Sequence, residues 1–497
     1  MKRTGWRVGL LSMTGLLGVG SGLGAAFGQE RPAESLAPIA EEARRAVPTH
    51  IGGVFPRLAL PGAHRAQGLD SGIAALLSWA DRLWVLGFAG PGSEGSGLFE
   101  VDADLQWRRN PASVAEAQRS GNRLIHQESG QAFIGPYVIK ADGSVRLIPS
   151  LKDQPLAATA RHLVDPAGLV YHLTASGTLF ETQVQSLETR KLAELKEVLN
   201  LPGQASVTVH AAAMTQGRLV VALDAGDHGP AGKRPMGRLV QWDGSAWSVV
   251  REDQFLDVAR IGQGDQGVLY AVGQDQSSTI LHVLDQGTWW RYRLPRGTTA
   301  GTRGGASAVA PMRVRPIEQG VILLDAAGLF YELPATGPAD GSAWIISPLA
   351  QHQRSRADLA PWRGLVVLAG VPENGDQGSA QANLWLVNPE QLGAIGKPRG
   401  SGAVWWDQPV EEGSVSDPFL MSGFDQKGIH LTHSGKDVAT FTIEVDFLGD
   451  GTWKTYASIQ VFPGVYAHHE FPAGYSAHWV RVRCDTACRA TATFIYR

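Results

Sequence analysis

The sequence predicts an all-β protein, a seven-bladed β-propeller followed by a C-terminal β-sandwich. Glycine is abundant, with 60 of 497 residues, and runs of β-branched and aromatic residues lie between the glycines. This composition is typical of many short strands joined by tight turns. From residue 73 onward, a unit of four such strands recurs about every 40 residues. Because small sheets in a closed ring cover each other's faces, the repeat indicates a propeller.

The first 28 residues have the pattern of a secretory signal peptide. Lys2, Arg3 and Arg7 precede an apolar run from Val8 to Phe27. An uncleaved membrane anchor is the alternative, since the run approaches the length that spans a bilayer. Cleavage after residue 28 removes three basic residues and changes the net charge from −3 to −6. We therefore expect a secreted or periplasmic protein with no stable membrane anchor and no nucleic-acid partner.

Residues 29–72 are interpreted as an N-terminal leader and residues 73–400 as the propeller. The expected innermost strands begin at residues 73, 123, 160, 209, 256, 312 and 357. Several second strands follow a glycine that comes after a polar residue, as at Gly217 and Gly320. The units also show continuous apolar runs, which fit strands that are covered on both faces. The pattern therefore predicts about seven blades.

The pattern changes near residue 400, after a Gly-Lys-Pro-Arg-Gly-Ser-Gly break at 396–402. Strands with a new spacing follow, and they predict an antiparallel sandwich over residues 401–497. Cys484 and Cys488 flank a turn between its last strands. Export permits a disulfide between them, and a pair of free thiols is the alternative. Two cysteines are too few for a typical structural zinc site.

Long connections predict the functional face. They fall between the second and third strands, at 90–96, 225–236 and 370–380, and between successive units, at 110–121, 149–157 and 296–311. Both kinds of connection emerge at one end of a propeller. Because binding residues concentrate on loops that a rigid scaffold positions, we expect the functional surface at this end.

The expected innermost strands carry many cationic side chains in a protein that is acidic overall. A basic channel of this kind favours an anionic ligand such as a uronate or a sulfated sugar. The alternative is structural, with arginines that tie neighbouring blades together. The candidates for substrate binding are Arg123, Arg161, Tyr171, Arg313, Arg356 and Asp358. The densest set of chemically useful side chains lies in Asn122–Ser129.

Two reactions fit the residue types. In β-elimination from a uronate, a His or Tyr removes a proton while Arg neutralises the carboxylate. In glycoside hydrolysis, carboxylates act as acid and base, and Asp165, Asp224 and Asp227 are further acids in plausible places. The candidate catalytic residues are His126, Glu128, Tyr137 and His162.

No motif predicts a cofactor or a metal centre. The residues Asp224, Asp227 and His228 form one loop that could hold a cation, although a solvated loop is the favoured interpretation. Adjacent histidines on a strand face opposite ways, so the pair at 468–469 does not suggest a shared metal ion. We interpret that pair and His478 as packing or interdomain contacts.

Four segments carry a resemblance to a known group. They are 122–129 with 131–137, 160–166, 242–250 and 471–481. In these the chain resembles a largely uncharacterised group of secreted bacterial propellers, over most of its mature length. The architecture is distantly similar to propeller glycoside hydrolases and polysaccharide lyases. The chain departs from the group at Arg303, where the resemblance implies a His; if that His belongs to the group's site, this member is altered.

The expected function is that of a secreted carbohydrate-active propeller that acts on an acidic polysaccharide, as a lyase or a glycoside hydrolase. The alternative is a non-catalytic propeller that binds a glycan or a protein. Retained His and Arg geometry in a cleft favours the enzyme, whereas a flat or aromatic face favours the binding protein. Architecture alone does not decide between them.

Overall fold

A computed structural model gives the structure of the chain. It describes residues 57–64, 72–88, 95–114, 120–203, 205–226, 236–262, 264–297, 312–318, 320–336, 344–352, 354–372 and 381–497. Within these ranges almost every element is a strand, and six four-stranded sheets lie beside one five-stranded and one eight-stranded sheet. The prediction of an all-β protein is confirmed. The expected signal peptide lies outside the described residues.

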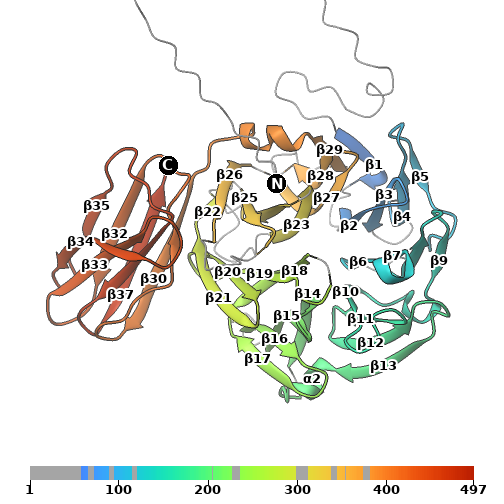
Figure 1. The fold of residues 1–497 in the computed structure, drawn as a ribbon, viewed down its shortest axis with the longest axis horizontal. Helices are drawn as coiled ribbons and strands as arrows, with labels where there is room; N and C mark the ends of the chain where they lie inside the picture. Colours follow the sequence, from blue (N-terminus) through green and yellow to red (C-terminus); the bar gives the residue numbers. More distant parts are fainter. Residues whose placement is uncertain are drawn as a thin grey trace, which may run out of the picture.

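The sheets succeed one another around a ring, in the arrangement of a β-propeller (Figure 1). The first two sheets are β2 (Gly72–Trp79), β3 (Arg82–Phe88), β4 (Gly97–Val101) and β5 (Trp107–Arg109), then β6 (Arg123–His126), β7 (Gln131–Ile134), β8 (Tyr137–Lys140) and β9 (Val145–Leu147). The next two are β10 (Leu156–Arg161), β11 (Leu169–Thr174), β12 (Thr178–Gln183) and β13 (Thr189–Glu194), then β14 (Ser206–Thr215), β15 (Arg218–Gly226), β16 (Met236–Trp242) and β17 (Trp247–Arg251).

The remaining sheets of the ring follow the same order. They are β18 (Gln254–Ile261), β19 (Val268–Gln274), β20 (Thr279–Asp285) and β21 (Thr288–Leu294), then β23 (Met312–Glu318), β24 (Val321–Ala326), β25 (Leu329–Pro334) and β26 (Ser347–Gln351), then β27 (Arg354–Trp362), β28 (Leu365–Pro372) and β29 (Gln381–Val387). The first strand of each sheet faces the centre of the ring (Figure 1). We call β2, β6, β10, β14, β18, β23 and β27 the inner strands.

Local sequence explains the meanders. Strand β19 is buried along its whole length, as expected for a sheet that is covered on both faces. Two-residue turns join the first and second strands of several sheets. In the turn Gln216-Gly217, φ is 48° and 71°, and in Arg363-Gly364 it is 51° and 75°. Positive φ at both positions defines the type I′ turn, whose twist matches that of a hairpin.

A strand from the N-terminal region closes the ring. Strand β1 (Arg57–His64) pairs antiparallel with β29 and completes the sheet that starts with β27. Leu60 of β1 is fully buried in the core between this sheet and the β2–β5 sheet. The stretch 29–72, interpreted from sequence as a leader, therefore contains a strand of the ring. The closure joins both ends of the propeller to one sheet.

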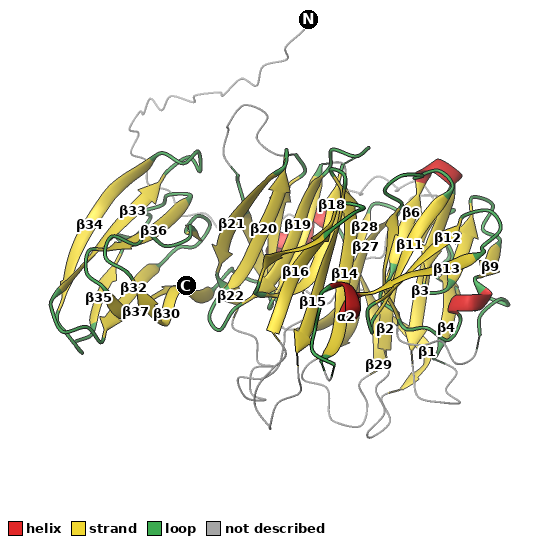
Figure 2. Ribbon diagram, turned by 90° about the horizontal axis from the view of Figure 1, so that it is seen from below, coloured by secondary structure: helices red, strands yellow, loops and turns green. Residues whose placement is uncertain are grey.

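The C-terminal part forms two sheets that face each other. One contains β22 (Arg296–Gly297), β30 (Gly400–Val410), β37 (Cys488–Tyr496), β32 (Lys427–His433) and β35 (Ala467–Glu470). The other contains β31 (Phe419–Leu420), β36 (Trp479–Cys484), β33 (Ala439–Asp446) and β34 (Trp453–Val461). Phe419 stacks on Phe494 of the opposite sheet, with ring centroids 4.8 Å apart. We call residues 400–497 the C-terminal unit, which lies beside the ring (Figure 2).

The ring and the C-terminal unit share a sheet and a core. Strand β31 pairs in parallel with β21, so the β18–β21 sheet continues into the C-terminal unit as one eight-stranded sheet. Buried side chains of both parts belong to one hydrophobic cluster. His478 accepts a hydrogen bond from Ile346 N at 3.1 Å, which confirms it as an interdomain contact. Pairing β21 in this way also covers an edge that would otherwise be open.

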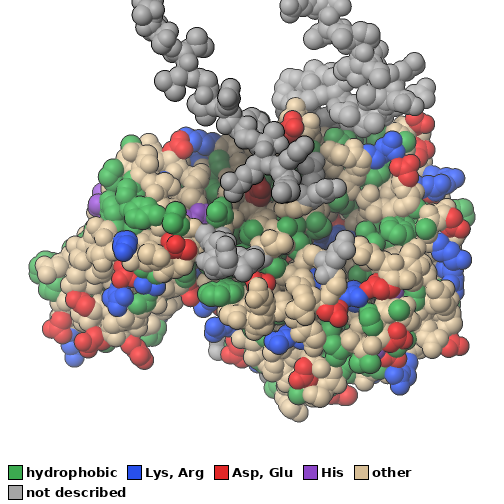
Figure 3. Space-filling model, viewed as in Figure 1, with side chains coloured by type: hydrophobic (Ala, Val, Ile, Leu, Met, Phe, Trp, Pro, Cys, Tyr) green, Lys and Arg blue, Asp and Glu red, His purple; other side chains and the backbone are tan. Residues whose placement is uncertain are grey.

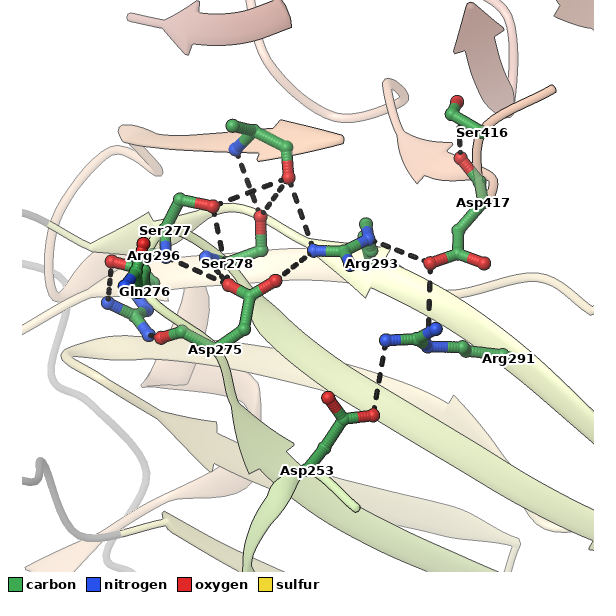
Figure 4. Close-up of polar contacts among 11 residues, drawn as sticks. Asp253, Asp275, Gln276, Ser277, Ser278, Arg291, Arg293, Arg296, Ser416 and Asp417 are labelled. Carbon is green, nitrogen blue, oxygen red and sulfur yellow. Dashed lines mark hydrogen bonds and ion pairs between the residues drawn. The ribbon is translucent and has the colours of Figure 1, made fainter. Parts of the chain in front are cut away.

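Ion pairs reinforce this junction (Figure 4). Arg293 is buried and contacts Asp275, and its Nε donates to Asp417 Oδ2 at 2.9 Å. Arg291 lies 3.1 Å from Asp253 and 3.4 Å from Asp417. Burial opposes ionisation of Arg293, yet Asp275 and Asp417 raise its pKa above the ordinary value. Asp417 thus ties the C-terminal unit to two arginines of β21.

The two cysteines are free thiols, which is the alternative considered from sequence. Their Sγ atoms lie 3.8 Å apart, and Cys484 is buried. Burial and the neighbouring Cys484 raise the pKa of Cys488 to about 12. Since the thiolate is the reactive form, Cys488 is a poor nucleophile in this state.

Candidate functional site

Five charged side chains from four inner strands meet inside the ring. We call them the channel cluster: Arg123 of β6, Asp257 of β18, Arg313 and Arg315 of β23, and Asp358 of β27. Both aspartates are almost fully buried. The arginines Arg123 and Arg315 keep 14% of their side-chain surface exposed. The cluster contains two of the predicted arginines and the predicted Asp358.

Bulges in the inner strands position the two aspartates. The pairing register shifts between Arg356 and Asp358 in β27 and between Phe255 and Asp257 in β18. A bulge turns a side chain away from the regular pleat, and here both carboxylates reach the next inner strand. Asp358 Oδ2 accepts from Leu76 N at 2.9 Å, and Asp257 Oδ2 accepts from Val314 N at 2.9 Å. The two aspartates therefore link neighbouring sheets of the ring.

The arginines pair with these carboxylates. Arg123 forms an ion pair with Asp358 and Arg315 forms one with Asp257. Arg315 also lies 3.3 Å from Asp358, so a chain of alternating charges crosses the channel. These ion pairs fit the structural alternative stated from sequence, in which arginines tie neighbouring sheets of the ring together.

Three arginines and two aspartates of the cluster lie close together, and burial acts on the charge of each group. Burial lowers the pKa of Arg123 to about 9, a shift that Asp257 opposes and Arg313 reinforces. Burial raises the pKa of Asp257 even though Arg313 and Arg123 favour its charged form. Among the described residues, Arg123 Nη2 is buried without a hydrogen-bond partner. An anion beside it would satisfy both the charge and the free N–H.

A second charged group lies at one end of the inner strands. We call it the rim cluster: Glu128, Arg161, Arg260 and Asp265. Arg161 pairs with Glu128 and reaches Asp265 Oδ1 at 2.8 Å. Burial disfavours the carboxylate of Glu128, yet hydrogen bonds to the backbone and to Arg161 hold its pKa below the ordinary value. Burial and the nearby Arg161 lower the pKa of Arg260.

The rim cluster lies opposite the end where we expected the functional face. Glu128 and Asp265 belong to connections between the first and second strands of their sheets. The predicted face carries the connections between second and third strands, and between successive sheets.

Tyr137 starts the third strand of its sheet and so lies near the predicted face. In the pairing register His126 lies opposite Gln131, whereas Tyr137 lies opposite Ile134. The structure therefore does not bring Tyr137 together with His126 and Glu128.

The histidines proposed for catalysis are engaged within the protein. His126 is fully buried, and its ring nitrogens contact Ser129 Oγ at 2.7 Å and Pro166 O at 2.6 Å. His162 is 8% exposed. Its Nε2 lies 3.1 Å from Glu181, and its Nδ1 accepts from Asp165 N at 2.9 Å. Both nitrogens of each imidazole are thus used, and no described contact leaves one directed at a substrate.

The two candidate tyrosines are also buried. The hydroxyl oxygen of Tyr137 accepts from Val114 N at 3.1 Å. Tyr171 packs against His162 with ring centroids 4.4 Å apart. Burial raises the pKa of both tyrosines above the ordinary value. A base needs an accessible, easily ionised group, so neither tyrosine suits proton abstraction in this conformation.

Some predicted residues cannot be placed with the others. Arg356 belongs to β27, where its backbone pairs with Gly370 of β28, and its side chain lies outside the described part. Asp227, His228 and Arg303 also lie outside it. Asp224, from the same proposed cation loop, pairs with His210 at 3.0 Å. Within the described residues, no group of three or more His, Cys, Asp or Glu side chains is placed to hold a metal ion.

Sequence reasoning missed Asp257 and Asp265. One signal for Asp257 was available, because Leu256-Asp257-Val258-Ala259 matches Ala357-Asp358-Leu359-Ala360 at the same position of the repeat. Since an aspartate at that position was singled out in one repeat, the other repeat could have been included. Asp265 lies in a short polar connection, where nothing in the local sequence separates it from a solvated loop residue.

Comparisons with known proteins concern the fold alone. No family model matches the chain, and no curated protein matches it. Among solved structures, YCF48 from Cyanidioschyzon merolae is similar with a TM-score of 0.39 and 11% identity, over 68% of this chain and 99% of that chain. The WD40 repeats of RRP9 are similar with a TM-score of 0.40 and 8% identity, over 67% of this chain and 100% of that chain. The Cps50 (Swd1) β-propeller domain of Myceliophteria thermophila is similar with a TM-score of 0.38 and 10% identity, over 64% of this chain and 98% of that chain.

The β-propeller arrangement rests on the sheet topology of this chain. At such low identity the comparisons carry no information about ligands, reactions or partners. Among the described residues, no helix is both long enough and apolar enough to cross a membrane. The charged clusters and the exposed surfaces of this chain are the features that bear on its function.

Proposed function

We propose that the protein is a secreted, non-catalytic propeller that binds an acidic polysaccharide. In this proposal the ring has seven blades, with β1 completing the last, and residues 401–497 form a β-sandwich. The carboxylate or sulfate groups of the glycan are neutralised by the arginines of the channel cluster. Glycan binding without reaction was the alternative to catalysis in the sequence analysis.

One observation carries the proposal: among the described residues, the buried Arg123 Nη2 of the channel cluster has no hydrogen-bond partner, and the Arg315 guanidinium lies in the same cluster. Guanidinium groups bind carboxylates and sulfates through paired N–H donors, and low dielectric surroundings strengthen such contacts. The acidic net charge of the chain makes this basic interior distinctive. A neutral ligand would gain nothing from it.

The contacts of the candidate catalytic groups favour binding over catalysis. His126, His162 and Tyr137 are buried and already hydrogen-bonded to the protein. Glu128 is held as a carboxylate by Arg161, whereas a general acid needs a raised pKa. Supporting evidence for a lyase or hydrolase would have been an exposed acid–base pair on one face of the ring.

The test uses the chain from residue 29 onward with polygalacturonate, alginate and chondroitin sulfate, and with dextran as a neutral control. Binding is followed by affinity electrophoresis, and reaction by new reducing ends and by the ultraviolet absorbance of unsaturated uronates. We expect at least one acidic polymer to retard the chain more strongly than dextran does, and no product. Product formation by the purified chain would overturn the non-catalytic proposal, and no retardation by any acidic polymer would overturn the ligand class.

A further inference from the structure

The C-terminal unit exposes a small group of aromatic and imidazole rings. His430 of β32 lies directly opposite His468 of β35 in the antiparallel register, so both side chains emerge on the same face. Tyr466 precedes β35 and completes the group. The exposed fraction is 59% for Tyr466 and 47% for the His468 side chain. We call these three residues the ring platform.

The three rings lie close together with similar orientations. The centroids of His430 and His468 are 5.6 Å apart, and those of Tyr466 and His468 are 6.4 Å apart with planes only 7° from parallel. His430 and Tyr466 have centroids 5.7 Å apart, and His430 Nδ1 hydrogen-bonds to the Tyr466 hydroxyl. This bond and the strand pairing hold the rings in place before any ligand arrives, which reduces the entropy that binding costs.

The surroundings of the platform are polar at the edge and apolar at one end. Glu470 is an exposed carboxylate 3.8 Å from His468 Nε2. The turn from Phe462 to Val465 precedes Tyr466, and both of these residues are about half exposed, at 59% and 49%. Burial and His468 lower the pKa of His430, which favours its neutral imidazole.

The ring platform lies away from the propeller. Strand β35 is at the far side of the C-terminal unit from the propeller (Figure 1), whereas β31 pairs with β21 of the propeller. Figure 3 shows hydrophobic side chains on the visible surface of the C-terminal unit and a histidine side chain at its far edge. A ligand bound here would not touch the channel cluster.

We propose that the ring platform of His430, Tyr466 and His468 is a second saccharide site, which takes the uncharged face of a pyranose ring. A pyranose has a flat C–H face that packs on exposed rings and hydroxyls at its edge that pair with polar atoms. The platform supplies exposed rings, whose apolar bodies and polar tips suit such a ligand. The Tyr466 hydroxyl, the imidazole nitrogens and Glu470 supply the polar partners.

Size and charge argue for a sugar rather than a protein partner. A stable protein interface uses about 20–30 residues on each side, and the platform with its adjoining turn offers far fewer. The lowered pKa of His430 favours a neutral imidazole, which offers no cation to a sulfate or carboxylate. The inference therefore concerns ring stacking, and it does not depend on the arginines of the proposed function.

The experiment measures binding of cellohexaose, mannohexaose and xylohexaose to the chain from residue 29 onward, by saturation-transfer NMR and calorimetry. We expect at least one neutral oligosaccharide to bind, and Tyr466→Ala to weaken it at least tenfold with an unchanged melting temperature, because the side chain is exposed. The matched control is Trp290→Ala, which removes another half-exposed aromatic residue, 47% exposed, from β21 of the ring. We expect Trp290→Ala to bind normally.

Equal binding by wild type and Tyr466→Ala, or no binding of any of the three sugars, would overturn the inference. Self-association of the wild type that Tyr466→Ala abolishes would overturn it in favour of a contact between two copies of the chain. The test is separate from that of the proposed function. If the neutral sugars bind but no acidic polymer does, the platform stands and the channel proposal fails.

Discussion

Replacing Asp358 with alanine is expected to lower the free energy of unfolding by about 3–5 kcal/mol, since it breaks a buried ion pair. The substitution leaves Arg123 buried without its carboxylate and removes the acceptor of Leu76 N. Asp358 is 1% exposed, so water cannot take over either role. Urea unfolding of the mature chain, followed by tryptophan fluorescence, measures the change.

Two further variants make this test specific. Asp265→Ala removes a carboxylate that also pairs with an arginine but is 70% exposed, and we expect it to cost at most about 1 kcal/mol. Asp358→Asn keeps an acceptor for Leu76 N and should fall between the two. If Asp358→Ala is as stable as Asp265→Ala, Asp358 does not connect the sheets in the way described.

Acid is expected to destabilise the ring through two buried histidines. Burial lowers the pKa of His172 to about 3 and, together with nearby arginines, that of His282 to about 3. In the unfolded chain a histidine has a pKa of about 6.5. Between pH 6.5 and pH 3 the unfolded state therefore binds more protons. The contribution of these histidines to the free energy of unfolding is fully present above pH 6.5. It decreases as the pH falls, by about 1.4 kcal/mol per pH unit for each histidine.

His282→Leu isolates this contribution. Among the described residues, neither ring nitrogen of His282 has a hydrogen-bond partner, and the ring packs near Phe255 and Trp289. An apolar residue of similar size should fit, and it cannot take up a proton. We expect the stability difference between pH 7 and pH 4.5 to shrink by about 3 kcal/mol. His468→Gln, at an exposed site, should leave the difference as in the wild type. An unchanged difference in His282→Leu would contradict the assignment.

The repeat was visible in the sequence because every sheet needs the same local pattern. Apolar runs such as Val268–Gln274 and turn pairs such as Gln216-Gly217 are dictated by local burial and by φ. The closure by β1 was not visible. Strand β1 pairs with β29, more than 300 residues away in the chain, and its sequence Arg-Leu-Ala-Leu-Pro-Gly-Ala-His resembles no outer strand of the repeat. Only the ring as a whole determines where that strand belongs.

The residue types of the site were predicted better than their roles. Arg123, Arg313 and Asp358 do meet in the channel, because inner strands necessarily converge at the centre of a ring. Whether His126 faces a ligand or the protein depends on a hydrogen bond to Pro166 in the next sheet, which sequence spacing does not reveal. The bulges before Asp257 and Asp358 are likewise features of strand pairing, and they decide which way the carboxylates point.

The most direct measurement of the central claim compares polygalacturonate binding by wild type, Arg313→Gln and Arg251→Gln at low and at physiological salt. Arg313 belongs to the channel cluster, whereas Arg251 is an exposed arginine at the end of the outer strand β17. Loss of one charge-assisted contact costs about 1.5–3 kcal/mol, so we expect Arg313→Gln to bind at least tenfold more weakly. We expect Arg251→Gln to match the wild type, and salt to weaken the wild type more than Arg313→Gln. Equal affinity of Arg313→Gln and wild type would contradict an anionic glycan held by the channel arginines.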